Sequence, residues 1–173
     1  MSDYDSRNIF EKLGTFVPGY AGYEQREGRR RTDKALRAAV ARNLSGKKPM
    51  IEGLIDRSPH QGSSALVAML DSVRSHADFA ANKILHTEYG NSGFFDIVQV
   101  DAKDLDTLYA FDLGIAVRSA AVAKAIEDLN ATGATPQALE QILQNLQEIE
   151  TLMDTRMNVL REVSPHAATH ASA

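Results

Sequence analysis

The chain has 173 residues, of which 43% are hydrophobic and 24% charged, and its formal net charge is −4. This is long enough to bury the core of one domain. The absence of cysteine excludes disulfide bonds and thiolate metal sites. No uncharged apolar run approaches the ~20 residues of a membrane-spanning helix, and the polar, acidic N-terminus does not resemble a secretory signal. We therefore expect a cytoplasmic protein without a transmembrane segment.

The net charge conceals an asymmetry along the chain. Residues 1–48 contain eleven Lys or Arg and six Asp or Glu, a net charge of +5. Residues 49–173 contain eight and seventeen, a net charge of −9. Such a division favours contact between the two parts of one chain, or between opposite parts of two copies.

Hydrophobic residues recur at helical spacing nearly everywhere, and no stretch alternates as a strand would. A short helix is predicted over residues 5–13, followed by a turn that contains Pro18 and two glycines. A second helix is predicted over 20–44. Residues 46–62 then form a connector with one helical turn, because a proline and a glycine near its end prevent a longer helix.

Three long helices follow, over about 63–89, 101–133 and 135–163. Asp101 is the predicted N-cap of the second, and Thr135 caps the third, with a proline in its first turn. Their seams are Leu66, Leu70, Val73, Ala77, Ala80 and Ile84; then Leu105, Leu108, Asp112, Ile115, Ser119, Val122, Ile126 and Leu129; then Leu139, Ile142, Leu146, Ile149, Met153, Arg156, Leu160 and Val163.

The short link after Gly133 makes the last two helices an antiparallel hairpin. The predicted fold class is all-α, an up-down antiparallel bundle of about four long helices with a short N-terminal helix. We expect a single domain over 1–163, made of a basic N-terminal helical segment (1–48) and a three-helix core (63–163). Residues 164–173 are expected to be a disordered tail.

Two seam positions hold charged residues where aliphatic ones are expected, Asp112 and Arg156. Counting outward from the helix connections places Asp112 in the interior, paired with Arg156 or with Arg74. One interpretation is an acid poised for proton or ion chemistry. We favour a pair that fixes the register of similar seams, because no second carboxylate or histidine joins Asp112 on its seam.

No catalytic motif emerges. A di-iron carboxylate site needs Glu-x-x-His on two helices, which is missing here, and the predicted seams contain no glutamate. The strongest group of possible ligands is His86, Glu88 and Asp96, around a glycine turn. It is a weak alternative as a metal or small-molecule site, and we expect a solvated helix end there. We assign no catalytic residue and no cofactor.

The short N-terminal helix has a small apolar face formed by Ile9, Phe10 and Leu13. Such a face can lie on a membrane surface. Its small size, with acidic residues beside it, favours docking on the bundle instead, so peripheral membrane contact is the second reading.

The helix predicted over 20–44 is apolar only in its C-terminal half. Its N-terminal half is polar on every side, which indicates a helix that forms charge pairs or bridges solvent. The candidate residues for contact with an anion are Arg26, Arg29, Arg30, Arg31, Lys34 and Arg37, with Tyr20 and Tyr23 in the turn before them.

Three readings of this basic helix remain open. The first, which we favour, is contact with the acidic end of its own bundle or of a second copy. The second is an external acidic protein, membrane surface or nucleic acid, and the third is a solvated face. Three acids within the basic run and a pI near 5.7 disfavour nucleic acid. The acidic end consists of Glu88, Asp96, Asp101, Asp104 and Asp106.

Three segments, PGYAGYEQREGRRRTDKALR, YGNSGFFD and LDTLYAFD, resemble an uncharacterised family of small helical bacterial proteins. The resemblance covers residues 15–115 at most; it implies a bacterial setting and carries no activity. We expect a non-enzymatic interaction or assembly module that self-associates or binds an acidic partner through helix 20–44. The alternatives are a metal or small-molecule site near His86, and binding to nucleic acid or an anionic membrane surface.

Overall fold

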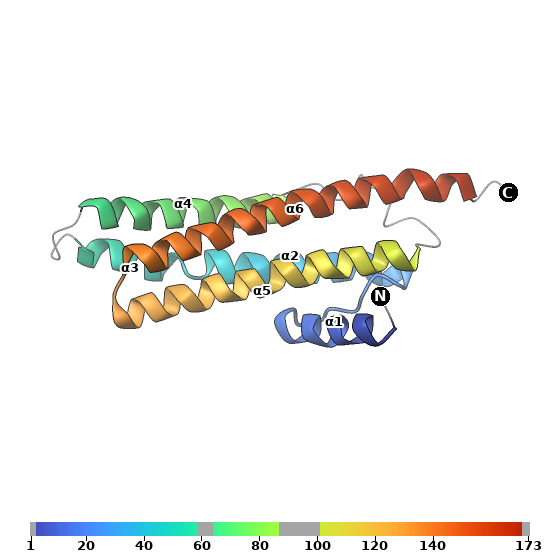
Figure 1. Cartoon of the computed structure of the whole chain (residues 1–173), viewed down its shortest axis with the longest axis horizontal. Helices are drawn as coiled ribbons and strands as arrows, with labels where there is room; N and C mark the ends of the chain where they lie inside the picture. Colours follow the sequence, from blue (N-terminus) through green and yellow to red (C-terminus); the bar gives the residue numbers. More distant parts are fainter. Residues whose placement is uncertain (1–2, 59–63, 87–100, 171–173) are drawn as a thin grey trace. The chain divides into compact units, whose positions relative to one another are not determined.

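The computed structural model describes residues 3–58, 64–86 and 101–170. Within these ranges the regular elements are α-helices and there is no strand. The predicted class is therefore confirmed: four long helices in antiparallel packing, with a short helix at the N-terminus. The helices are α1 (Asp3–Phe16), α2 (Arg26–Ser45), α3 (Lys48–Arg57), α4 (Ser64–His86), α5 (Ala102–Thr132) and α6 (Pro136–His170) (Figure 1).

Several boundaries differ from the prediction. Helix α2 begins six residues later than expected, because Gly19 and Gly22 have φ of +84° and +78°, which a right-handed helix does not allow. The connector contains a ten-residue helix, α3. Its proline lies in the first turn, where the missing N–H would have no partner within the helix. Helix α6 reaches His170, so residues 164–170 of the expected tail have a helical backbone.

The chain divides into two compact units. Unit 1 draws on Met1–Ala39, Thr87–Ala116 and Thr151–Ala173, and unit 2 consists of Val40–His86 and Val117–Glu150. The long helices α2, α5 and α6 contribute residues to both units.

Unit 2 contains α4 and the antiparallel hairpin of α5 and α6. The predicted seam of α4 is buried at every position, from Leu66 to Ile84. Helix α3 packs against α4, and Lys48 of α3 forms an ion pair with Asp78 of α4 at 2.7 Å. The hairpin turns at Gly133, whose N–H donates to the carbonyl of Leu129 and whose φ is +96°. This is the left-handed conformation that glycine provides at a helix C-terminus.

The surface of unit 2 is tied by ion pairs between neighbouring helices. Arg118 of α5 pairs with Glu148 of α6 at 2.6 Å, and both side chains are partly exposed. Such pairs add little stability each, typically below about 1 kcal/mol. The apolar seams therefore hold unit 2 together.

Unit 1 combines α1, the first part of α2, the first part of α5 and the last part of α6. Leu13 of α1 and Val17, just after the helix, are fully buried, whereas Ile9 is partly exposed. Leu36 of α2, Leu108 of α5 and Leu160 of α6 are also buried. Among these apolar side chains lies a group of buried polar residues, which is the most unusual feature of the unit.

Candidate functional site

Residues 17–25 connect α1 to α2 without helical structure, and we call them the tyrosine strap. The strap leaves α1 through a hydrogen bond from the Tyr20 N–H to the Val17 carbonyl at 3.1 Å. Two glycines with positive φ then turn the backbone. As a result the side chains of Tyr20 and Tyr23, which are 8% and 0% exposed, both point into unit 1.

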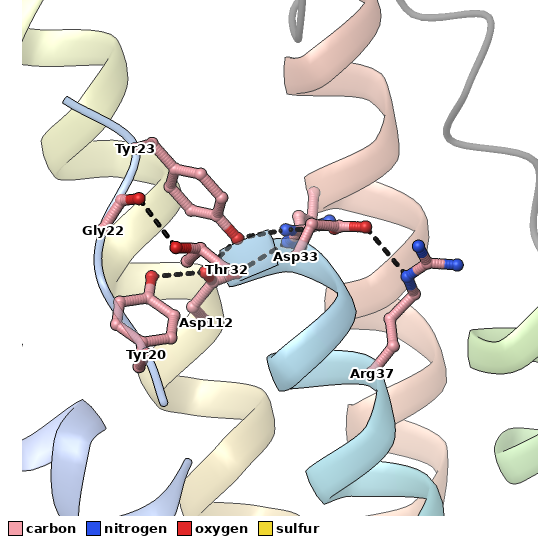
Figure 2. Close-up of polar contacts among 8 residues, drawn as sticks. Tyr20, Gly22, Tyr23, Thr32, Asp33, Arg37 and Asp112 are labelled. Atoms are coloured by element: carbon pink, nitrogen blue, oxygen red, sulfur yellow. Dashed lines mark hydrogen bonds and ion pairs between the residues drawn. The ribbon is translucent and has the colours of Figure 1, made fainter. Parts of the chain in front are cut away.

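Both tyrosines donate a hydrogen bond to the same carboxylate oxygen of α5. Their hydroxyl groups lie 2.6 Å and 2.7 Å from Oδ2 of Asp112, and the Tyr20 bond is drawn in Figure 2. The backbone N–H of Tyr23 also donates to the hydroxyl of Tyr109 at 3.0 Å. The rings of Tyr23 and Tyr109 are stacked, with centroids 5.8 Å apart. Asp112 is thus the point at which the strap is fastened to α5.

Arg156 of α6 approaches Asp112 from the other side. Its Nε donates to Oδ1 of Asp112 at 2.6 Å, and both side chains are at most 1% exposed. The pair expected from the seams is therefore present, with Arg156 as the partner. Arg74, the other candidate partner, forms an ion pair with Asp71 on its own helix.

Arg156 also binds α2 and the strap. One terminal nitrogen donates to the Tyr23 hydroxyl at 2.7 Å and to Asp33 at 2.9 Å. Asp33 in turn forms an ion pair with Arg37, whose Nε lies 2.8 Å from its Oδ2 (Figure 2). Two carboxylates and two guanidinium groups balance in charge, which the low dielectric of an interior requires. We call Tyr20, Tyr23, Asp33, Asp112 and Arg156 the polar cluster.

The first turns of α2 are fastened to the strap as well. Nε of Arg29, which is 1% exposed, donates to the Tyr23 carbonyl at 2.6 Å. The Thr32 hydroxyl donates to the Gly22 carbonyl at 2.8 Å and accepts from the Ala21 N–H at 3.3 Å. Burial, followed by the nearby charge of Arg26, lowers the pKa of Arg29. These contacts satisfy strap backbone groups that have no helix or sheet to pair with.

The electrostatics keep the tyrosines neutral. Burial raises the pKa of Tyr20 and of Tyr23 well above the ordinary value, and the charge of Asp112 raises it further, while Arg156 acts in the opposite direction. Burial also raises the pKa of Tyr109. A tyrosine held in this form donates a hydrogen bond and does not serve as a base or nucleophile near neutral pH. This arrangement is suited to holding segments together.

The predicted basic residues of α2 fall into two groups. Arg29 is buried and Arg37 is partly buried, and both contact the strap or the polar cluster. Four others are exposed: three of them follow one another at intervals of four residues, and the fourth lies directly after the second of these. We call these four the basic row: Arg26, Arg30, Arg31 and Lys34.

Other predicted site residues are not brought to the cluster. His86 is exposed at the end of α4, while Glu88 and Asp96 lie outside the described residues. In the part of the chain that the structure describes, no three His, Asp or Glu residues are grouped to hold a metal ion. Of the predicted acidic end, Asp101 caps α5 by accepting from the Lys103 N–H at 2.8 Å. Contact between this end and the basic row stays a prediction.

Sequence reasoning missed the inward orientation of Asp33 and Thr32. A signal was available, because the buried positions Leu36, Val40 and Leu44 continue backward at helical spacing to Asp33 and Arg29. The N-terminal half of α2 is therefore not polar and solvated on all sides. Its inner face is polar because it meets a polar interior.

Comparisons with protein-family models, with curated proteins and with solved structures find no match to this chain. Among the described residues, no helix is both long and apolar enough to cross a membrane.

Proposed function

We propose that the chain is a non-catalytic interaction module whose basic row binds an acidic segment of a partner protein. The observation that carries the proposal is the orientation of Asp33. This acid interrupts the basic run in the sequence, but its side chain is 1% exposed and is bound to Arg156 and Arg37. The exposed side of α2 over residues 26–34 therefore presents four cations, the basic row, beside a single exposed acid, Glu27.

The spacing of the row fits a carboxylate-bearing helix. Arg26, Arg30 and Lys34 follow one another at intervals of four residues, which places them about 6 Å apart along α2. Glutamates or aspartates at the same interval on a second helix can pair with them. A row of this kind gives orientation and salt-sensitive association more than high affinity.

Two observations favour a protein over a nucleic acid or an anionic membrane. Single-stranded nucleic acid binds by stacking its bases on aromatic side chains beside cations, whereas Tyr20 and Tyr23 are buried beside Asp112. The net charge of −4 also repels an extended polyanion as a whole. A short acidic segment meets only the local positive charge.

Fluorescence anisotropy tests the proposal with three probes at equal concentration. They are an alanine-based helical peptide with glutamate at every fourth position, a single-stranded oligonucleotide, and vesicles made anionic by phosphatidylserine. We expect the peptide to bind best, and its affinity to fall as salt is raised. The double substitution Arg30→Ala and Lys34→Ala should weaken peptide binding by roughly fivefold to thirtyfold, since each exposed pair contributes up to about 1 kcal/mol.

The matched control removes two exposed positive charges of unit 1 that lie outside the row, Lys12→Ala with Arg161→Ala. This variant has the same net charge as the test variant. Equal weakening in both would show a non-specific charge effect and contradict the proposal. Stronger binding of the oligonucleotide or of the vesicles would contradict the choice of partner. Sedimentation of the protein alone at low and high salt shows whether the acidic partner is a second copy.

A further inference from the structure

We propose that the tyrosine strap positions the basic row, so that closure of the strap and binding of an acidic partner are coupled. The inference rests on the function proposed above, and adds how that binding surface is held and regulated. The first turns of α2 have two sides. Arg29, Thr32 and Asp33 face the strap and the polar cluster, while the basic row occupies exposed positions of the same turns.

The first nine residues of α2 have little to keep them helical. No aliphatic side chain of α2 is buried before Leu36, and Gly28 lies within the first turn. Helices of this length are marginal in water without an apolar face to pack. Glycine weakens such a segment further. The helix must therefore be held by its polar contacts.

Those contacts lead mainly to the strap. The Arg29 Nε donates to the Tyr23 carbonyl, and the Thr32 hydroxyl bridges the Gly22 carbonyl and the Ala21 N–H. The bond between Asp33 and Arg156 joins the same stretch of α2 to α6. The strap itself is fastened through the two tyrosine hydroxyls on Asp112.

Opening of the strap therefore releases the start of α2. The row would then lie on a fraying helix, and its cations would no longer keep their four-residue spacing. A partner that needs this spacing binds only the closed form, so its apparent dissociation constant rises as the closed fraction falls. By the same linkage, a bound partner favours the closed strap.

Two substitutions loosen the strap without changing any charge. Tyr23→Phe removes one hydroxyl from Asp112, and Thr32→Val removes the bridge to Gly22 and Ala21. Ile142→Val, a buried truncation in unit 2, is the control for lowered overall stability. Hydrogen exchange of the amides in 21–34 and affinity for the acidic helical peptide are measured on each variant.

We expect both strap variants to speed exchange over 21–34. Peptide binding should weaken by the reciprocal of the closed fraction, roughly tenfold where that fraction falls to about a tenth. Saturating peptide should slow exchange of these amides in the wild-type chain. Ile142→Val should change neither quantity. Exchange that shows the strap mostly open with unchanged affinity would overturn the coupling, as would weaker binding with unchanged exchange.

The charge variant separates this inference from the function beneath it. If Arg30→Ala with Lys34→Ala does not weaken binding, the basic row is not the binding surface and the proposed function fails. If that variant weakens binding while Tyr23→Phe and Thr32→Val do not, the surface stands and only the role of the strap fails. If Tyr23→Phe prevents folding, Thr32→Val still tests the inference, because Thr32 is not part of the polar cluster.

Discussion

Arg156 of α6 and Asp112 of α5 meet at 2.6 Å in the interior of unit 1, on seam positions that aliphatic residues would normally occupy. Each of the two residues also has other partners. Arg156 also binds Asp33 and the Tyr23 hydroxyl, and Asp112 also accepts from both strap tyrosines. One ion pair thus joins α2, α5, α6 and the strap. Such a network specifies one arrangement of these segments, whereas an apolar core would tolerate several.

Removing the cation should be strongly destabilising. In Arg156→Met, Asp112 and Asp33 both lose a buried positive partner, and we expect the free energy of unfolding to fall by about 3–5 kcal/mol. Urea denaturation followed by circular dichroism measures this loss. Adding Asp33→Asn and Asp112→Asn to the same chain should restore part of the stability, because no uncompensated carboxylate then remains buried.

The control is an exposed ion pair. Lys124→Ala removes the partner of Asp128. The side chains of Lys124 and Asp128 are 73% and 60% exposed. We expect a loss below about 1 kcal/mol. A loss of similar size in Arg156→Met would mean that the buried pair does not hold unit 1 together.

The two strap tyrosines should differ in their contribution to stability. The Tyr23 hydroxyl donates to Asp112 and accepts from Arg156, whereas the bond of the Tyr20 hydroxyl to Asp112 lies at a slightly exposed position. Tyr23→Phe should lower the free energy of unfolding by about 1–3 kcal/mol, as expected when a charged acceptor loses a donor. Tyr20→Phe should lower the free energy of unfolding by less in the same denaturation measurement. The reverse order would contradict the assignment of the hydroxyl contacts.

Stability should fall in alkaline solution because of these tyrosines. Their pKa values are raised in the folded protein, mainly by burial, so the unfolded chain releases protons first as pH increases. The stability that the raised pKa values contribute is fully present below the ordinary tyrosine pKa of about 10. Above that pH, the free energy of unfolding falls by about 1.4 kcal/mol per pH unit for each tyrosine. The urea midpoint between pH 8 and pH 11 measures the slope.

Tyrosinate absorbance provides the check on this alkaline loss. In the wild-type chain, ionisation of the buried tyrosines should coincide with unfolding and not precede it. The double variant Tyr20→Phe and Tyr23→Phe should show a shallower fall of stability above pH 10. An equal slope in both proteins would mean that other groups cause the alkaline loss.

Two glycine substitutions should have opposite signs. An added Cβ at Gly28 meets only the Gly22 carbonyl oxygen at 3.9 Å, an ordinary contact, so Gly28→Ala should stabilise α2 by about 0.5–1 kcal/mol. At Gly133 the space is open but φ is +96°, so Gly133→Ala should destabilise the hairpin by about 1–2 kcal/mol through backbone strain. Thermal unfolding of both variants tests the pair of signs.

The fold could be read from the sequence because its long helices have regular seams. The residues predicted to line α4 are buried throughout, and the turn at Gly133 lies where the cap signals placed it. Helix periodicity depends on local spacing, which a single sequence displays directly. The start of α2 differs from the prediction because Gly19 and Gly22 redirect the backbone with positive φ, which residue spacing does not reveal.

The polar cluster was only partly predictable. Asp112 and Arg156 stand out because charged residues interrupt apolar seams. Asp33 does not stand out, since it lies in a run of charged residues and its burial depends on contacts with α6. Tyr20 and Tyr23 drew attention as aromatic residues beside cations, which suggested stacking, whereas their hydroxyl groups are used to bind Asp112.

The polar cluster also bears on the order in which the chain is made. The Tyr23 hydroxyl and its Arg156 partner are separated by 133 positions. At about 5–20 residues per second, a ribosome needs roughly 7–27 s to synthesise that interval. During this time the strap and the first turns of α2 have emerged without Arg156, one of the two arginines that pair with Asp33. The polar cluster is therefore completed only after Arg156 of α6 has been made, although the strap tyrosines are the first of its residues to be made.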